Sequence, residues 1–185
     1  GVCGVDERLE VCDLYDWDKM TTLLAAQKPL WQLGADAGYH AVTWGYLPGE
    51  LVRRITGQTL GQYFREQIAA PLQADCFIGL PDSEIHRVAD LIGPNRARLQ
   101  AVAPAAPAIP PLYAEAMLNP IIRPYKDACS NTWRGAEIAA ANGQANARGI
   151  ARVYDIMACG GAVNGRSYIS AQGIARGSKL EKEDG

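Results

Sequence analysis

Tyr39 is the side chain in this sequence whose type and setting point most clearly to acid–base chemistry. It follows Gly38, and apolar and small residues after it recur at helical three-and-four spacing through residue 53. This spacing predicts a helix with Tyr39 at its N-terminus, near the positive end of the helix dipole. A free tyrosine hydroxyl has a pKa of about 10. Tyr39 therefore needs neighbouring cations if it is to act as a base near neutral pH.

Helices and turns on both sides of Tyr39 are predicted from breaking and capping residues. Upstream, residues 19–27 read as a helix rich in alanine and leucine, and residues 31–34 form a turn that leads to the tyrosine. Downstream, Gly57 is the expected C-cap of the helix after Tyr39. Thr59 and Gln62 have the spacing of a capping box, which predicts that the next helix starts there.

The second half of the chain has its own start and stop signals. Asn146 is the predicted cap of a helix at residues 147–159. Residues 162–168 contain Asn-Gly and predict a tight hairpin, because both residues accept the positive φ values of a type I′ turn. Ser170 is expected to begin another helix. Residues 93–111 are rich in alanine and proline and predict an extended surface loop.

These segments, in their order, resemble serine hydrolases of the class C β-lactamase fold, and most closely the family VIII-type carboxylesterases. The Tyr-His-Ala often found in those esterases stands here at residues 39–41. Further matching segments are Thr56–Phe64, Ile68–Leu72, Cys76–Pro81, Ala136–Ile138, Asn142–Gly143, Ala147–Arg152 and Gly160–Gly161. The resemblance covers residues 13–176 and is weakest between residues 82 and 125.

The resemblance implies acyl transfer by a serine nucleophile in a Ser-x-x-Lys motif, with Tyr39 as general base and then general acid. A later strand motif of the family supplies a backbone donor for the oxyanion. The serines of this chain are Ser83, Ser130, Ser167, Ser170 and Ser178, and none has a lysine three positions on. We therefore expect the nucleophile before residue 1 and the strand motif after residue 185. The chain alone is expected to be inactive.

Three residues besides Tyr39 are candidates for binding the substrate. Asn142 and Gly143 match a segment that lines the substrate pocket in the family, although Asn-Gly is also an ordinary turn signal. Trp31 is bulky enough to line an acyl pocket, and core packing is the alternative. His40 is expected to pack beside the tyrosine and receives no role in proton transfer.

The resemblance implies an α+β fold of the β-lactamase/transpeptidase type for the parent protein. Residues 1–185 are expected to form the central part of one such domain, truncated at both ends. This part is mostly the α-helical region, with one small β-hairpin.

Composition excludes several other classes of function. The net charge is −2 and no basic stripe is present, so nucleic acid is not an expected partner. No Cys-x-x-Cys or His-x-x-x-His occurs, which argues against a metal site, and no cofactor is implied. The uncharged run at residues 101–114 is too short and too rich in proline to span a membrane. The five scattered cysteines favour a reducing compartment, and hence the cytoplasm. The oligomeric state is left open.

Two classes of function remain. The first is a hydrolase of short-chain carboxylic esters, with a β-lactam or a D-alanyl peptide as the alternative substrate. An ester is favoured because Ala41 stands two positions after the tyrosine, where the lactamases carry an asparagine. The second is a non-catalytic fragment or pseudoenzyme that binds a ligand without turning it over.

The chain also departs from the family pattern at positions where glycine or proline matters. Leu33 and Ala139 replace prolines, and Gln73 stands where the family generally has glycine. Pro48 lies inside the helix predicted after Tyr39, where a proline costs about 3 kcal/mol and forces a kink. On that basis, Pro48→Val is expected to raise thermal stability.

Overall fold

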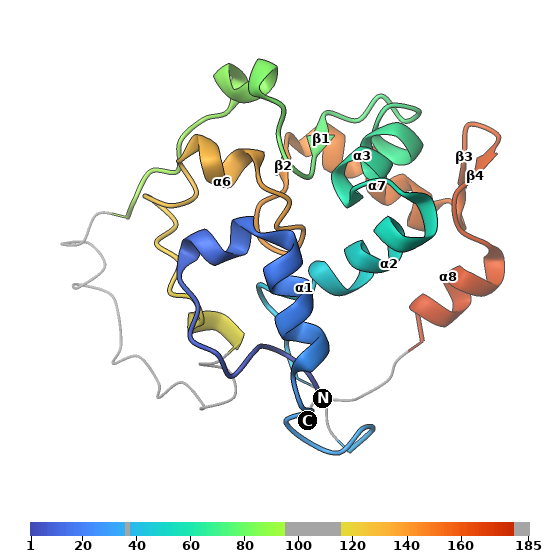
Figure 1. The fold of residues 1–185 in the computed structure, drawn as a ribbon. Helices are drawn as coiled ribbons and strands as arrows, with labels where there is room; N and C mark the ends of the chain where they lie inside the picture. The colour runs from blue at the N-terminus through green and yellow to red at the C-terminus, as the bar shows by residue number, and fades with distance from the viewer. Residues whose placement is uncertain (36–37, 95–115, 180–185) are drawn as a thin grey trace.

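Helix α1 (Trp17–Ala26) runs through the middle of the molecule (Figure 1). The structure is a computed structural model that describes residues 1–35, 38–94 and 116–179. Its other elements include helices α2 (Tyr46–Thr56), α3 (Leu60–Phe64), α6 (Asn131–Gly135), α7 (Ala147–Ala158) and α8 (Ala171–Gly177), and the shorter or irregular turns η1 (Val11–Tyr15), η2 (Arg65–Ala69) and η3 (Asp82–Arg87). Strands β1 (Cys76–Phe77) and β2 (Gln144–Ala145) pair with each other, as do β3 (Ala162–Val163) and β4 (Arg166–Ser167). The described residues are therefore mainly helical, as the sequence predicts.

The core forms where α1 meets segments that are distant in the sequence. Its buried members are Val5, Leu9, Leu14, Met20, Leu24, Val42, Tyr46, Trp133 and Ile138. The ring of Tyr46 lies 5.1 Å from that of Trp17, and its hydroxyl donates a hydrogen bond to the carbonyl oxygen of Leu14. Burial raises the pKa of Tyr46 above its usual range. The first residue of α2 is thus fixed in the core beside α1.

Pro48 explains where α2 begins. The helix does not start at Tyr39, as the sequence predicted, but at Tyr46. Pro48 is then the third helical residue. A backbone N–H at this position has no acceptor within the helix, so the N–H that proline lacks is not missed there. A helix that reached back to Tyr39 would place this proline in its interior. The predicted kink is therefore wrong, and Pro48→Val is not expected to raise the melting temperature.

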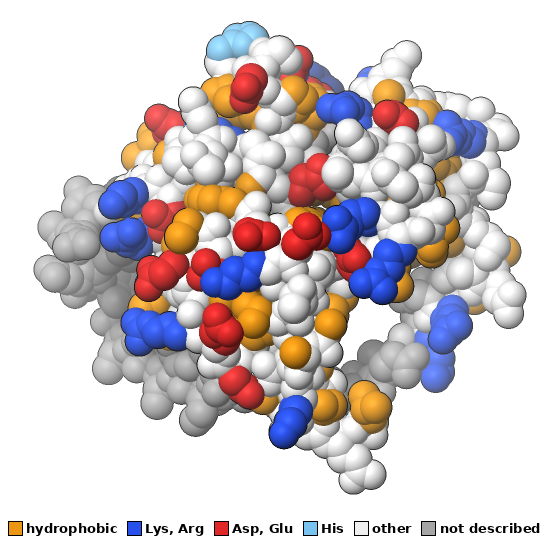
Figure 2. Space-filling model, viewed as in Figure 1, with side chains coloured by type: hydrophobic (Ala, Val, Ile, Leu, Met, Phe, Trp, Pro, Cys, Tyr) orange, Lys and Arg blue, Asp and Glu red, His pale blue; other side chains and the backbone are white. Residues whose placement is uncertain are grey.

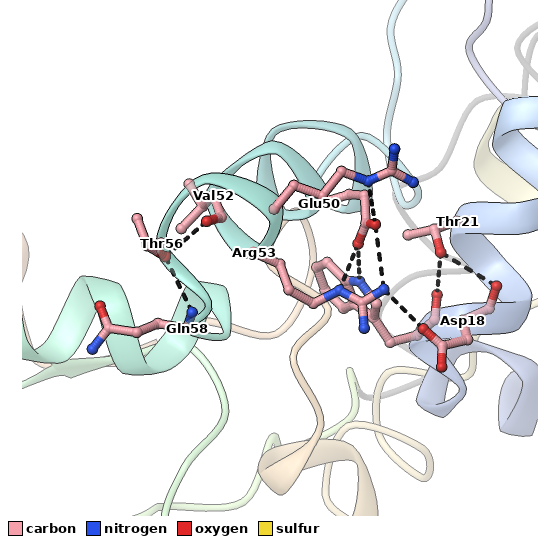
Figure 3. A network of polar contacts seen from close by, with 9 residues as sticks. Asp18, Thr21, Glu50, Val52, Arg53, Thr56 and Gln58 are labelled. Carbon is pink, nitrogen blue, oxygen red and sulfur yellow. Dashed lines mark hydrogen bonds and ion pairs between the residues drawn. The ribbon is translucent and has the colours of Figure 1, made fainter.

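A carboxylate at the centre of a polar network joins α2 to α1 (Figure 3). Glu50 accepts hydrogen bonds from Nε1 of Trp17, Nε of Arg53 and Nε of Arg54, each at 2.8 Å. Arg53 also reaches Asp18 of α1, at 2.9 Å. Acidic and basic side chains accordingly lie side by side across the face of the molecule shown in Figure 2. The donors from Arg53, Trp17 and Arg54 lower the pKa of Glu50 from 4.5 to about 2.

We expect Glu50→Gln to lower the free energy of unfolding by about 1–2 kcal/mol at pH 7, because hydrogen bonds to a charged acceptor are lost. The folded-state pKa of Glu50 lies below its unfolded value. The contribution of the carboxylate is therefore complete above pH 4.5 and is lost as the pH falls towards 2. Urea unfolding of both proteins between pH 7 and pH 2.5 should show the difference narrowing with acid. Asp18→Asn is the control, because the Asp18 side chain is 79% exposed and should contribute little. A difference that persists unchanged in acid would contradict this account.

A second carboxylate, Glu137, holds the start of α3. Its oxygens accept hydrogen bonds from the Thr59 hydroxyl at 2.6 Å and from the Gly61 backbone N–H at 2.9 Å. The predicted capping box is also confirmed, since Thr59 accepts from the Gln62 N–H and Gln62 from the Thr59 N–H. The segment before α7 is thereby tied to a helix N-terminus far away in sequence.

The two helix caps and the hairpin predicted for the second half of the chain are confirmed. Asn146 caps α7, where its side chain accepts from the Gly149 N–H at 2.8 Å, and Ser170 caps α8 in the same manner. The hairpin of β3 and β4 turns at Asn164 and Gly165, which have φ values of 51° and 76°. The loop predicted at residues 93–111 falls almost entirely outside the described residues.

Gln73 has a φ of 51°, in the left-handed region that favours glycine. A glycine, which the resemblance implies for this position, would adopt this conformation without strain. We expect Gln73→Gly to raise the free energy of unfolding by about 1 kcal/mol, because the steric cost of a Cβ in this conformation is removed. Gln73→Ala is the matched control: it removes the same side chain but keeps the Cβ, so it should give no gain. Urea unfolding of the two variants makes the test, and equal stability in both would contradict it.

Candidate active site

Tyr39 lies on the connection between α1 and α2, within residues 38–41, which have no regular secondary structure. Its side chain is 67% exposed. The prediction that Tyr39 stands at a helix N-terminus is wrong, because α2 begins at Tyr46. The field of a helix dipole acts within the first turn. Any activation of the Tyr39 hydroxyl must therefore come from nearby charged groups.

Trp31 supports the backbone immediately before Tyr39. The indole is half-buried, and it packs so closely on Gly38 that an added Cβ there would lie 2.5 Å from Cη2 of the ring. The loop is also tied to the N-terminal segment, because the Leu30 N–H donates to the carbonyl oxygen of Gly1 at 2.7 Å. The structure thus places the ring of Trp31 against Gly38, the residue that precedes Tyr39 in the chain.

His40 and Thr43 fix the chain after Tyr39. Nε2 of His40 lies 2.5 Å from Oγ1 of Thr43, which is buried. Burial lowers the pKa of His40. The imidazole is therefore neutral at pH 7 and places no positive charge beside Tyr39.

The turn at residues 138–142 packs against the residue that precedes α2. An added Cβ at Gly45 would lie 2.8 Å from the Cβ of Ala139 and from the backbone nitrogen of Ala140. The turn itself is closed by the Ala141 N–H, which donates to the Ile138 carbonyl at 2.7 Å. Gly45 therefore allows the chain before α2 to approach the segment that carries Asn142.

Asn142 is 1% exposed, and its side chain is bonded to the backbone around it. Nδ2 donates to the carbonyl oxygens of Trp133 at 2.7 Å and Ala136 at 2.5 Å, and Oδ1 accepts from the Ile138 N–H at 3.0 Å. This arrangement gives the amide a structural task. A contact between Asn142 and substrate stays a prediction. Gly143, the next residue, is exposed.

The sequence analysis missed two residues close to Tyr39. Thr43 contacts His40, and Trp44 is 53% exposed just before α2. The signal for Thr43 was its position three residues after His40, a spacing that also fits an ordinary turn. Trp44 carried no sequence signal, since tryptophan is buried in most settings.

A separate pocket of about 390 Å³ lies between η3 and the β1–β2 pair. It is lined by Asp75, Phe77, Leu80, Glu84, Arg87, Val88, Ala89, Gln144, Ala145 and Asn146. Its cation, Arg87, is already paired with Glu84 and Asp75. The four predicted site residues do not line this pocket.

Within residues 1–35, 38–94 and 116–179, no three His, Cys, Asp or Glu side chains gather in a way that would hold a metal ion. The same residues contain no helix with the length and apolar character needed to cross a membrane. Cys12, Cys76, Cys129 and Cys159 are free thiols.

Comparison with known proteins places this geometry in context. The family model described as Beta-lactamase matches residues 7–183. The chain is 35% identical over 168 residues to the esterase/beta-lactamase LipL of Mycobacterium tuberculosis, an alignment that covers 86% of this chain and 38% of LipL.

Two solved structures share the fold. A family VIII carboxylesterase matches with a TM-score of 0.84 and 44% identity, over 98% of this chain and 47% of its own. A penicillin-binding protein homolog from Caulobacter crescentus matches with a TM-score of 0.78 and 41% identity, over 94% of this chain and 44% of its own. The chain therefore spans less than half the length of each of these relatives.

Proposed function

The chain belongs to the beta-lactamase family, and on this premise we propose that it is part of a serine hydrolase that acts on short-chain carboxylic esters. Residues 1–185 are assigned to the central, mainly helical part of one hydrolase domain. The observation that carries the proposal is the placement of Tyr39. This side chain is exposed on a loop that Trp31 supports and that the buried Tyr46 anchors.

In the proposed reaction, a serine hydroxyl attacks the ester carbonyl carbon and transfers its proton to the oxygen of Tyr39. Tyr39 then donates that proton to the leaving alcohol as the C–O bond breaks, which leaves an acyl-enzyme. Water then attacks the acyl carbon and gives a proton to Tyr39, and Tyr39 returns this proton to the serine oxygen as the acyl–serine bond breaks and the acid is released. Tyr39 must be ionised to start the cycle, and a neighbouring lysine ammonium would favour that form. The Ser-x-x-Lys motif that supplies serine and lysine in the family is not in these 185 residues.

The substrate class is assigned from Ala41 and from the relatives. Ala41 lacks the side-chain amide that lactamases carry at this position, and the family VIII carboxylesterase is 44% identical to the chain. We further propose that Trp31 and Gly143 line the acyl pocket. Asn142 would then act mainly by holding Gly143 in place. A β-lactam or D-alanyl peptide is the alternative, favoured by the similarity to the penicillin-binding protein homolog.

The first experiment uses two proteins. One is the 185-residue chain, and the other is a chimera in which the chain replaces its matched segment in the family VIII carboxylesterase. We expect a fluorophosphonate to label a serine of the chimera outside the inserted chain, and the chimera to hydrolyse p-nitrophenyl butyrate. The 185-residue chain alone should take no label. Stoichiometric labelling of one of its own serines would overturn the assignment, because the mechanism would then have to be built on that residue.

A non-catalytic role is the second candidate, and the observation that favours it is the loss of glycine or proline at Leu33, Gln73 and Ala139, where the family pattern carries them. In that case the chain alone should melt cooperatively by circular dichroism. It should also bind an ester-derived phosphonate saturably and without a covalent bond, while the chimera hydrolyses neither an ester nor a β-lactam.

A further inference from the structure

Helix α2 exposes a row of large apolar side chains. Leu47, Leu51 and Ile55 are 39%, 62% and 82% exposed. They are spaced by four residues, so they lie along one side of the helix, which we call the α2 stripe. The other side of α2 carries the buried Tyr46 and Gly49, which pack towards α1 and α3.

Helix α7 has a similar row. Ile150, Tyr154 and Met157 are 48%, 68% and 41% exposed, at the four-and-three spacing of a helix face, and form the α7 stripe. A different side of α7 is packed: Ile156 is buried, and an added Cβ at Gly149 would lie 2.3 Å from the carbonyl oxygen of Asp75. Each helix therefore has two apolar sides. One side packs against other described elements, and the other side, the stripe, is exposed.

Such rows differ from the single exposed apolar residues that every protein surface carries. Repetition at helical spacing over two turns or more marks a face that packs against another element. The stripes themselves contain no charged residue, so a complementary partner is apolar as well.

The relatives indicate which partner this is. The chain matches 47% of the family VIII carboxylesterase, so more than half of that protein lies outside the matched segment and is available to cover its exposed faces. We propose that the α2 and α7 stripes are the surface on which the rest of a beta-lactamase family domain packs. The proposal rests on family membership and exposure, and it does not depend on the role of Tyr39.

Co-expression tests the proposal. The tagged 185-residue chain is produced together with the family VIII carboxylesterase from which the matched segment is deleted and replaced by a flexible linker. We expect the two polypeptides to co-purify. Two variants should reduce recovery about tenfold or more: the double variant Leu51→Glu/Ile55→Glu in the α2 stripe and the single variant Tyr154→Glu in the α7 stripe. Each variant places charge in an apolar interface.

Ile92→Glu is the matched control, because Ile92 is 92% exposed and lies outside both stripes. It should leave recovery unchanged. Far-ultraviolet circular dichroism checks that each variant melts like the unmodified chain, as expected for substitutions at exposed positions. Failure of the two polypeptides to co-purify, or equal recovery with the stripe variants, would overturn the proposal. A dimer of the chain alone that light scattering detects and that Leu51→Glu dissociates would also overturn it, in favour of a second copy as the occupant.

Discussion

Replacement of Tyr39 by phenylalanine in the carboxylesterase chimera is expected to lower kcat for p-nitrophenyl butyrate by about 100-fold or more. A general base and acid contributes about 10²–10⁴ to the rate of such a reaction, and phenylalanine keeps the ring while it removes the only atom that exchanges a proton. Because Tyr39 is 67% exposed, loss of its hydroxyl should leave the melting temperature unchanged. KM should change little, since the missing interaction serves the transition state.

Tyr125→Phe is the control for this experiment. Tyr125 is 52% exposed, and the change also removes one phenolic hydroxyl. It should have kcat and KM values close to those of the unmodified chimera. Retained turnover in the Tyr39→Phe variant would remove Tyr39 from the mechanism, whereas equal losses in both variants would indicate a general effect on folding.

The test can also separate the proposed function from the docking surface. A chimera that folds but is inactive with Tyr39 in place would contradict the esterase assignment without affecting the stripes. Loss of co-purification in the stripe variants would in turn support the docking surface even if the assembled protein hydrolyses no ester. The two proposals thus fail in different experiments.

Elements defined by local signals were predicted correctly from the sequence. Helix α7 has its cap in Asn146, and the β3–β4 hairpin has its turn in Asn164 and Gly165. In both cases the residues that decide the structure lie within a few positions of each other. The same holds for the capping box at Thr59.

The start of α2 was missed because two local signals conflicted. Helical spacing continued back to Tyr39, whereas Pro48 requires a place in the first turn. Pro48 determines where α2 starts, because a proline in a helix interior costs about 3 kcal/mol of stability. The helix therefore starts later than the apolar spacing alone predicts. Reading Pro48 as a first-turn residue would have placed the helix start correctly and Tyr39 in a loop.

Interactions between distant residues could not be predicted from a single sequence. Glu137 binds Thr59 and Gly61, which lie 78 and 76 positions away, and Glu50 binds Trp17 from 33 positions away. A glutamate in a loop or on a helix is usually solvated, so neither residue stood out. The close approach of Trp31 to Gly38 is likewise visible only in three dimensions.

Asn142→Ala is expected to lower the free energy of unfolding by about 3 kcal/mol. The substitution leaves the N–H of Ile138 and the carbonyl oxygens of Trp133 and Ala136 without their side-chain partner in a buried segment. Each unsatisfied buried group costs about 1–3 kcal/mol. Urea unfolding of the 185-residue chain measures the loss. Asn131→Ala is the control, because Asn131 is exposed at the start of α6 and its replacement should change stability by no more than about 0.5 kcal/mol.

The same variant distinguishes a structural role for Asn142 from a substrate contact. If the amide mainly holds the backbone before Gly143, stability falls steeply, and Asn142→Asp does no better, because its carboxylate would face two carbonyl oxygens. If the amide binds substrate directly, Asn142→Ala keeps the stability of the chain and raises KM in the chimera. The burial of Asn142 to 1% exposure and its three backbone partners favour the first result. Asn142, which matches a pocket-lining position in the family, would then act on the pocket indirectly, by holding the backbone that precedes Gly143.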